Sequence, residues 1–188
     1  KHISDQPGAA PVFPTSRTLT RFNDLDRANR FTSACSPMAY RDRYLEGLVG
    51  NVFICEPVHN LVHREIMVAQ GTSFSSSRDA NETESEFLTS SDNWFRPTMI
   101  RTGPDGALWI ADMYRLVIEH PEWIPRDWQE RLDLRSGADR GRIYRISRFD
   151  DQRPPAAPPI AGLDSRVLVK QLSSSNGWQR DMAQELLV

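Results

Sequence analysis

Two carboxylates, Glu56 and Asp112, end closely similar stretches of sequence, residues 50–56 and 106–112. A carboxylate at such a position can bind a cation or accept a proton from a hydroxyl group. It can equally cap a loop or pair with a nearby arginine. His59 follows in turn-like sequence, where it is either a general base or a structural or solvated histidine. His59, Glu56 and Asp112 are therefore the candidate catalytic residues.

The segments that position these residues occur twice, about 56 to 60 residues apart, which is a period typical of structural repeats. The first copy comprises residues 36–40, 50–56 and 60–64, and the second comprises residues 96–100, 106–112 and 141–145. Each copy is three short runs of β-branched and aromatic residues separated by turn residues, which predicts sequential antiparallel strands. This pattern favours the blades of a β-propeller. Two blades do not close a ring, so we expect the chain to be part of a larger protein.

The first blade is predicted to have strands at residues 36–41, 51–55 and 61–69, with a weak fourth at 72–76. The second is predicted to begin near Phe95, with further strands at 108–111 and 142–147 and a tight turn at 103–106. Residues 16–22 alternate like a strand, and residues 77–91 are expected to be a solvated loop. An insertion at about 112–140 contains a short helix that starts at Pro125. Its tryptophans and Tyr114 argue against disorder.

The predicted fold class is mainly β: the C-terminal blades of a β-propeller with a helical insertion, then the start of an α-helical HEAT-like solenoid. The partial propeller spans residues 1–149, a proline-rich linker spans 150–162, and a first helical pair spans 163–188. Asp164 is expected to cap the first helix, and Trp178 begins the second.

Composition argues against nucleic-acid binding and against a membrane span in this chain. The net charge is −2 without a basic cluster, which argues against nucleic-acid binding. No apolar run reaches the length of about 18 to 20 residues that a membrane span needs. Cys35 and Cys55 are predicted to lie opposite each other on neighbouring strands. A cross-strand disulfide and two packed free thiols both remain open.

Several long stretches resemble one protein family. They are residues 29–35 (NRFTSAC), 50–64 (GNVFICEPVHNLVHR), 92–97 (DNWFRP), 101–121 (RTGPDGALWIADMYRLVIEHP), 138–145 (ADRGRIYR) and 176–184 (NGWQRDMAQ). They resemble the large membrane-bound dehydrogenases of planctomycete-type bacteria, over about residues 13–188. Those proteins look like a sugar-dehydrogenase β-propeller followed by HEAT-like repeats and a c-type cytochrome domain. More distantly, the blades are similar to glucose and sorbosone dehydrogenases that use pyrroloquinoline quinone and calcium.

The resemblance implies an extracytoplasmic quinoprotein-like dehydrogenase, in the periplasm or cell envelope, that oxidises a sugar or alcohol. Its implied cofactors are pyrroloquinoline quinone and calcium, with haem only in a domain outside this chain. The chain departs from the full pattern because it lacks a Cys-x-x-Cys-His motif. Its implied partners are the substrate, the remaining blades and HEAT repeats, and an electron-accepting haem domain. The alternative is a non-catalytic propeller and HEAT platform that binds glycans or protein partners.

Loops at one end of the predicted blades carry the densest polar and aromatic sequence, which favours a working face there. Arg30, Arg96 and Arg115 could hold the carboxylates of an anionic quinone, or they could brace the loops. Trp94 and Tyr114 suit stacking on a sugar ring or planar cofactor, or burial between loops. These five are the candidate cofactor-binding residues, and no metal ligands are assigned.

Overall fold

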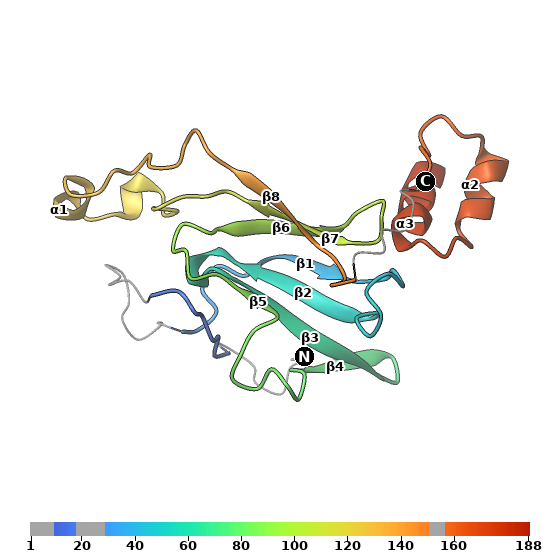
Figure 1. The fold of residues 1–188 in the computed structure, drawn as a ribbon, viewed down its shortest axis with the longest axis horizontal. Helices are drawn as coiled ribbons and strands as arrows, with labels where there is room; N and C mark the ends of the chain where they lie inside the picture. Colours follow the sequence, from blue (N-terminus) through green and yellow to red (C-terminus); the bar gives the residue numbers. More distant parts are fainter. Residues whose placement is uncertain (1–9, 18–28, 151–156) are drawn as a thin grey trace.

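The computed structural model describes residues 10–17, 29–150 and 157–188, in which two antiparallel β-sheets pack face to face (Figure 1). A long insertion extends from one end of the sheets, and a helical pair lies at the other end. The chain is thus mainly β, as the sequence pattern predicts. The two sheets do not close a ring within the described residues. The strand predicted at residues 16–22 falls largely outside the described ranges.

The first sheet has five strands in the order β1-β2-β3-β4, with β5 also paired to β3. All of its pairs are antiparallel. Its strands are β1 (Cys35–Ala39), β2 (Asn51–Glu56), β3 (Leu61–Gln70), β4 (Ser73–Ser77) and β5 (Leu88–Thr89). The four strands predicted for the first copy are therefore confirmed. β5 is an additional strand that the sequence pattern does not predict.

The second sheet has three antiparallel strands in the order β6-β7-β8. They are β6 (Pro97–Thr102), β7 (Leu108–Asp112) and β8 (Arg142–Ile146). Gly106 closes the β6–β7 turn with φ +76°, and an added Cβ would lie 2.5 Å from Asp42 Oδ1, so only glycine fits there. The insertion between β7 and β8 holds the 3₁₀ turn η3 (Pro121–Trp123) and the helix α1 (Arg126–Gln129), which has Pro125 at its N-cap.

One apolar core fills the space between the two sheets. Phe53, Cys55 and Val62 from the first sheet and Ile100, Leu108 and Ile110 from the second are all fully buried members of it. Successive residues of a strand point to opposite faces, so these alternate positions define the facing sides of the sheets. The burial of so much aliphatic and aromatic surface is the main stabilising term.

The two cysteines lie opposite each other on neighbouring strands, as predicted, because Cys35 and Cys55 are register partners on β1 and β2. Both are free thiols in the structure. Burial raises the pKa of Cys55 to about 12, with the neighbouring Cys35 adding to the effect. Burial and the nearby Glu56 also raise the pKa of Cys35. Both side chains are therefore protonated, weakly nucleophilic thiols at neutral pH.

The prediction of a solvated loop at residues 77–91 is wrong at two places. Leu88 and Thr89 form β5, and Glu86 is buried. Glu86 lies inside because His63 and Arg78 both bond its carboxylate, at 2.7 Å and 2.9 Å. Charged residues are usually exposed, so the charge-rich sequence of this segment gives no sign that the Glu86 carboxylate is buried and paired.

The C-terminal residues form a helical pair, α2 (Ser165–Gln171) and α3 (Gly177–Leu187). Asp164 caps α2 as predicted, since its side chain accepts hydrogen bonds from the backbone N–H groups of Arg166 and Val167. The pair packs on its own small core of Ile160, Leu168 and Ala183.

The helical pair is fastened to the sheets by buried Asp42. The Asp42 carboxylate accepts a 2.5 Å hydrogen bond from Gly177 N at the start of α3 and a 2.9 Å bond from Tyr44 N. Asn176 Nδ2 also donates to Pro104 O at 3.0 Å. The helical pair is therefore bonded to loops 42–50 and 103–106, which look like ordinary turns in the sequence.

Replacement of Asp42 by alanine is expected to loosen α3 from the sheets. It leaves two N–H groups in a buried site without their acceptor, which costs about 2 kcal/mol. Hydrogen–deuterium exchange should show faster exchange of residues 177–187 in Asp42→Ala than in the wild type. Asp164→Ala is the control, because it removes an exposed cap of α2 without touching the sheets. Unchanged protection of α3 in Asp42→Ala would contradict this role.

Candidate functional site

Glu56 clamps the loop that leads into β1. Its buried carboxylate accepts hydrogen bonds from Ser33 N at 2.9 Å, Ser33 Oγ at 2.7 Å and Thr32 N at 3.2 Å. Backbone N–H groups in a buried loop need acceptors, and a carboxylate that accepts several of them fixes the loop rigidly. Glu56 therefore holds residues 32–33 in place, and we call this arrangement a loop clamp.

His59 lies in the 3₁₀ turn η2 (Pro57–His59) directly after β2. Its Nδ1 is 3.2 Å from Glu56 Oε1, and its Nε2 accepts a 3.1 Å hydrogen bond from Asn29 N. Because Nε2 is an acceptor, the ring proton sits on Nδ1 and is donated to Glu56. Both ring nitrogens thus already bind the protein, and the imidazole links η2 to the segment at Asn29.

Asp112 repeats the role of Glu56 in the second sheet. Its Oδ1 accepts hydrogen bonds from Arg96 N at 2.7 Å, before β6, and from Tyr114 N at 2.8 Å, after β7. Tyr114 has φ 51°, a left-handed conformation that this bond helps to hold. Asp112 Oδ2 is buried and has no hydrogen-bond partner among the described residues.

Arg96 joins the two clamped loops. Its buried guanidinium donates to Pro57 O and Val58 O beside the first sheet, at 2.9 Å and 3.3 Å. It also donates to Arg115 O and Leu116 O beyond the second sheet, at 2.9 Å and 2.8 Å. The N–H groups of this one planar guanidinium therefore bond the loop after β2 and the loop after β7 at the same time. Glu56 and Asp112 consequently lie at the same end of the two sheets.

Asn60 is a further link at this end that the sequence motifs do not reveal. It has a left-handed backbone at φ 58°. Its Nδ2 donates to Phe95 O at 2.5 Å and to Asn93 O at 3.1 Å, on the loop that enters β6. A turn-type asparagine in the sequence signals the backbone conformation but not this contact across the sheets. We call the end formed by residues 29–34, 56–60, 91–96 and 112–116 the rim.

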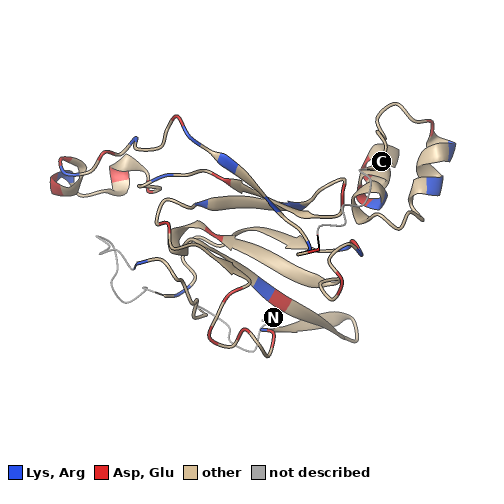
Figure 2. Cartoon of the chain, viewed as in Figure 1, with Lys and Arg blue, Asp and Glu red and all other residues tan. Residues whose placement is uncertain are grey.

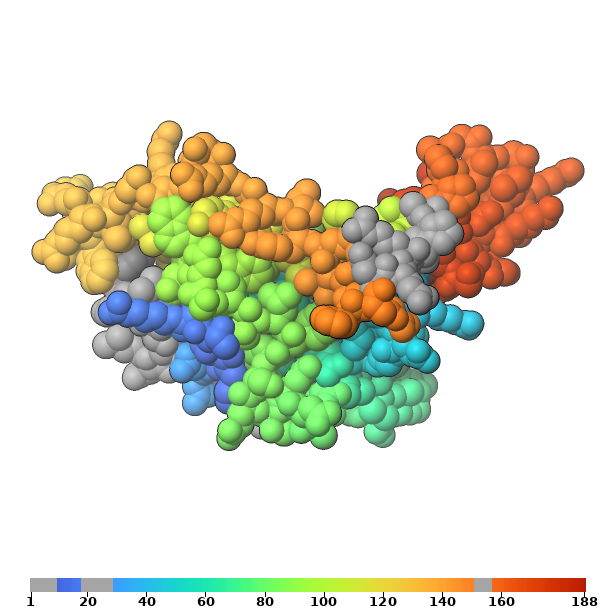
Figure 3. Space-filling view, viewed as in Figure 1, coloured from blue at the N-terminus to red at the C-terminus, as the bar shows by residue number. Residues whose placement is uncertain are grey.

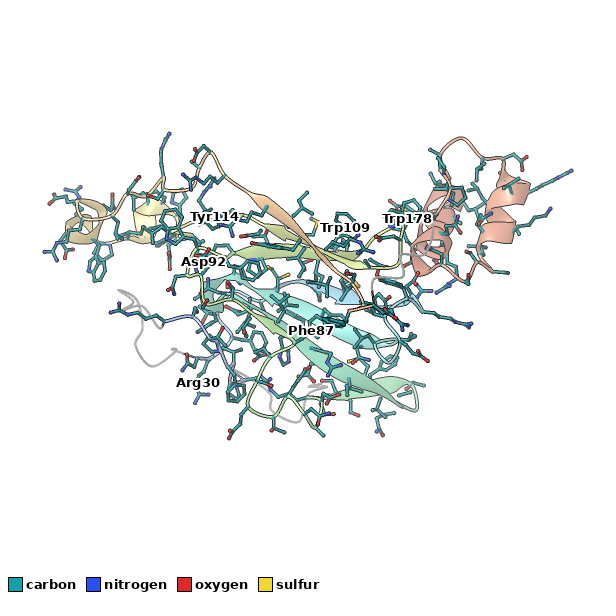
Figure 4. The ribbon with its side chains drawn as sticks, viewed as in Figure 1. Arg30, Phe87, Asp92, Trp109, Tyr114 and Trp178 are labelled. Atoms are coloured by element: carbon teal, nitrogen blue, oxygen red, sulfur yellow. The ribbon has the colours of Figure 1, made fainter. Side chains whose placement is uncertain are left out.

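The aromatic candidates form a cluster on the rim. Trp94 and Tyr114 have ring centroids 5.4 Å apart. Arg142 lies over the Tyr114 ring, with its guanidinium carbon 3.7 Å from the centroid, and donates to Tyr144 Oη at 2.8 Å. Figure 4 places Tyr114 and Asp92 at the same end of the sheets. Arg142 is absent from the sequence-based candidates because it lies on β8, far from the other rim residues in the chain.

The remaining two arginine candidates occupy different surroundings. Arg115 is half-buried in the insertion, where its guanidinium donates to Tyr114 O and Ala138 O at 3.3 Å and 3.4 Å. Arg30 is exposed on the segment that pairs with Pro11. Figure 4 shows Arg30 at the side of the first sheet and Tyr114 at the second. The structure thus gathers Arg96, Arg115, Trp94 and Tyr114 around Asp112 and places Arg30 apart from them.

A second buried charge network ties the N-terminal segment to β3. His63 Nδ1 lies 2.7 Å from Glu86 Oε2, and His63 Nε2 lies 2.8 Å from Glu65 Oε1. Glu86 Oε1 also accepts from Phe13 N at 3.0 Å and from Arg78. Burial opposes a charge on His63, but the hydrogen bonds to the two glutamates outweigh it and raise the pKa of His63. Likewise, hydrogen bonds from His63 and Arg78 overcome the effect of burial and lower the pKa of Glu86.

Acidic and basic residues are intermixed, so no large region of the described structure carries charge of one sign only (Figure 2). Figure 2 shows acidic and basic residues interspersed over the sheets and the helical pair. Across the described ranges, no group of three or more His, Cys, Asp or Glu side chains is placed to hold a metal ion. No helix in the described part of the chain is long and apolar enough to span a membrane.

Residues 1–150 match the family model of a domain of unknown function, DUF7133, so the chain belongs to this family. The matched region contains both sheets and the whole rim and stops before the helical pair. Neither a curated protein nor a solved structure matches the chain.

Substitution of Glu56 by alanine is expected to destabilise the protein by about 3 kcal/mol, because several buried donors lose their acceptor together. Thermal unfolding or urea titration measures this effect. Glu84→Ala, at an exposed glutamate, is the control and should be nearly neutral. A Glu56→Ala protein as stable as the wild type would show that the clamp is dispensable for folding.

The His63 network is expected to make stability depend on pH. The folded-state pKa of His63 is raised, so its contribution is complete below the unfolded pKa of about 6.5 and is lost as pH rises through the folded-state pKa. Glu86 acts in the opposite sense, since its lowered pKa gives a contribution that is lost as pH falls through the folded-state value.

The measurement compares the free energy of unfolding of the wild type and His63→Gln at a series of pH values. The advantage of the wild type should shrink as the pH is raised from about 6 to about 9. His120→Gln, at an exposed histidine, is the matched control and should show no such trend. An advantage that stays constant or grows with pH would disprove the raised pKa of His63.

Proposed function

We propose that the chain supplies two adjacent blades of a β-propeller, and part of its ligand-facing rim, to an extracytoplasmic quinoprotein-like dehydrogenase. The observation that carries the proposal is the pair of matched clamps, in which Glu56 and Asp112 hold equivalent loops at one end and Arg96 joins them. Such construction fixes loops around a common mouth, which suits ligand binding on a rigid scaffold. The substrate class, a sugar or alcohol, comes from the resemblance to planctomycete-type dehydrogenases.

In this proposal the rim residues divide into two groups by what they touch. Glu56, His59, Asp112 and Arg96 bond the protein's own backbone and hold the loops in place. Trp94 and Tyr114 offer partly exposed aromatic surface that suits a sugar ring. Catalysis by this chain is then mainly the positioning of loops and ligand.

The described residues do not by themselves fit pyrroloquinoline quinone and calcium. They contain no cluster of three metal-binding side chains, and the Arg96 guanidinium is directed at backbone carbonyls. The cofactor would need groups from other blades. In the same proposal, α2 and α3 begin a HEAT-like array, and electrons pass to a c-type haem domain outside this chain.

A second candidate function is a non-catalytic propeller and HEAT platform that binds glycans or protein partners. One observation favours it: the candidate base His59 uses both ring nitrogens in hydrogen bonds with the protein. A general base must reach the proton that it removes, so these bonds would have to open during catalysis.

The 188-residue chain is expected to show no dehydrogenase activity with added pyrroloquinoline quinone, calcium and an electron-accepting dye. The reason is that the cofactor site needs groups from the other blades. Sugar- or alcohol-dependent reduction of the dye by this chain alone would contradict the proposal.

The longer protein with all its blades separates the two candidate functions. Calcium-dependent quinone uptake with a changed absorbance spectrum supports the dehydrogenase. Saturable binding to a glycan array without any cofactor supports the platform. Trp94→Ala should weaken ligand binding in either case, whereas Trp123→Ala, at an exposed tryptophan of the insertion, is the matched control.

A further inference from the structure

The two cysteines of the chain face each other across neighbouring strands. Cys35 on β1 and Cys55 on β2 are register partners in an antiparallel pair. The Cα atoms of such partners lie about 4.5 to 5.5 Å apart, inside the range of about 4.4 to 6.8 Å found for disulfide-bonded cysteines. The sequence contains no third cysteine. Each thiol therefore has one possible disulfide partner in this chain, and the backbone holds that partner at a suitable distance.

Both side chains point to the inner face of the first sheet. Cys55 is fully buried in the core between the sheets, and Cys35 is partly buried against the same core. Both are free thiols in the structure, and Cys35 Sγ donates to Thr98 O at 3.6 Å. A thiol is a weak hydrogen-bond donor, so this contact opposes a rotation of the Cys35 side chain towards Cys55 only slightly.

The segment around Cys35 is held in place on both sides (Figure 3 shows how closely the two sheets pack). On one side, the Glu56 loop clamp bonds Ser33, with Ser33 N at 2.9 Å and Ser33 Oγ at 2.7 Å. On the other side, Ser36 has φ 51° and its Oγ accepts a 3.1 Å hydrogen bond from a backbone N–H group of β6. Fixed flanks keep Cys35 opposite Cys55, which favours a reaction between the two sulfurs.

We propose that Cys35 and Cys55 form a dithiol site that closes to a cross-strand disulfide when the protein meets an oxidant that is itself a disulfide. The thiolate of Cys35, the less buried of the two, attacks one sulfur of the oxidant and releases a thiolate, which leaves a mixed disulfide on Cys35. The Cys55 thiolate then attacks Cys35 Sγ and displaces the other half of the oxidant. The two cysteines lose two protons and two electrons, and the oxidant is reduced to two thiols.

The surroundings of the pair make this closure slow at neutral pH. Burial raises the pKa of Cys35, and the nearby Glu56 carboxylate adds to the effect. Burial also raises the pKa of Cys55 to about 12, with Cys35 adding to the effect and Arg101 opposing it. Because the thiolate is the attacking species, the disulfide forms faster as the pH rises.

The disulfide would fasten the start of β1 to the end of β2 independently of the Glu56 loop clamp. It closes a covalent ring of residues 35–55, which restricts the unfolded chain and so stabilises the folded one. Residues 29–34 of the rim lead directly into this ring. Oxidation therefore stiffens the entry to the rim, whatever ligand the rim binds. The inference goes beyond the proposed function and does not depend on it.

The test incubates the full 188-residue chain with oxidised glutathione at a pH of about 8.5, then alkylates it with iodoacetamide in denaturant before mass spectrometry. We expect a product about 2 Da lighter than the reduced protein, without alkyl groups, because two thiols have each lost a hydrogen atom. Its Tm should be higher by about 5 °C or more, and dithiothreitol should reverse both changes. Cys35→Ser is the matched control and should gain no stability under the same treatment.

Two alkyl groups on the treated wild-type protein would overturn the inference. A protein that stops at glutathione adducts, a covalent dimer on a non-reducing gel, or closure only in urea would overturn it as well, because each shows that the folded strands do not bring the two sulfurs together. The readout needs neither quinone nor substrate, so this inference and the proposed dehydrogenase fail separately.

Discussion

The structure depends on one constraint: loops that turn inward at the end of two packed sheets must have their backbone polar groups satisfied. Glu56 and Asp112 meet this need with one carboxylate for each sheet, and Arg96 meets it with one guanidinium for both. Because the acceptors of Arg96 are carbonyls of two separate loops, the relative position of the sheets and the shape of the rim are set together. Rigidity of the rim is thus a consequence of folding.

At the opposite end of the sheets a buried carboxylate also accepts hydrogen bonds from backbone N–H groups, but there it attaches the helical pair. Asp42 accepts from Gly177 at the start of α3 and from Tyr44 in its own loop. A buried carboxylate at a helix N-terminus satisfies free N–H groups and interacts favourably with the helix dipole. The proline-rich segment before the helices therefore leads into a docked element. Movement at the helical pair would have to break this contact.

The two sheets also differ in how complete they are. The first has two further strands, β4 and β5, and its far face meets Phe31 and the segment at Phe13 through the His63–Glu86 network. The second has three strands and leaves Trp109 and Ile143 open. The two sheets thus share a strand pattern but differ in the number of strands and in how far their outer faces are covered. Fold alone does not set function, so the function of this chain has to be established from its residues.

The sequence by itself determined every strand except β5, the order of those strands, the facing of Cys35 and Cys55, and the equivalence of Glu56 and Asp112. These follow from local alternation, turn residues and the internal repeat, all of which are short-range signals. Only the tertiary structure decided that Arg96 bridges two loops, that Glu86 is buried and that Asp42 seats α3. Their partners are distant in the chain, and a charged side chain has the same local sequence signal whether it is solvated or paired inside. Burial and pairing are decided by packing, which brings together residues that no local pattern connects.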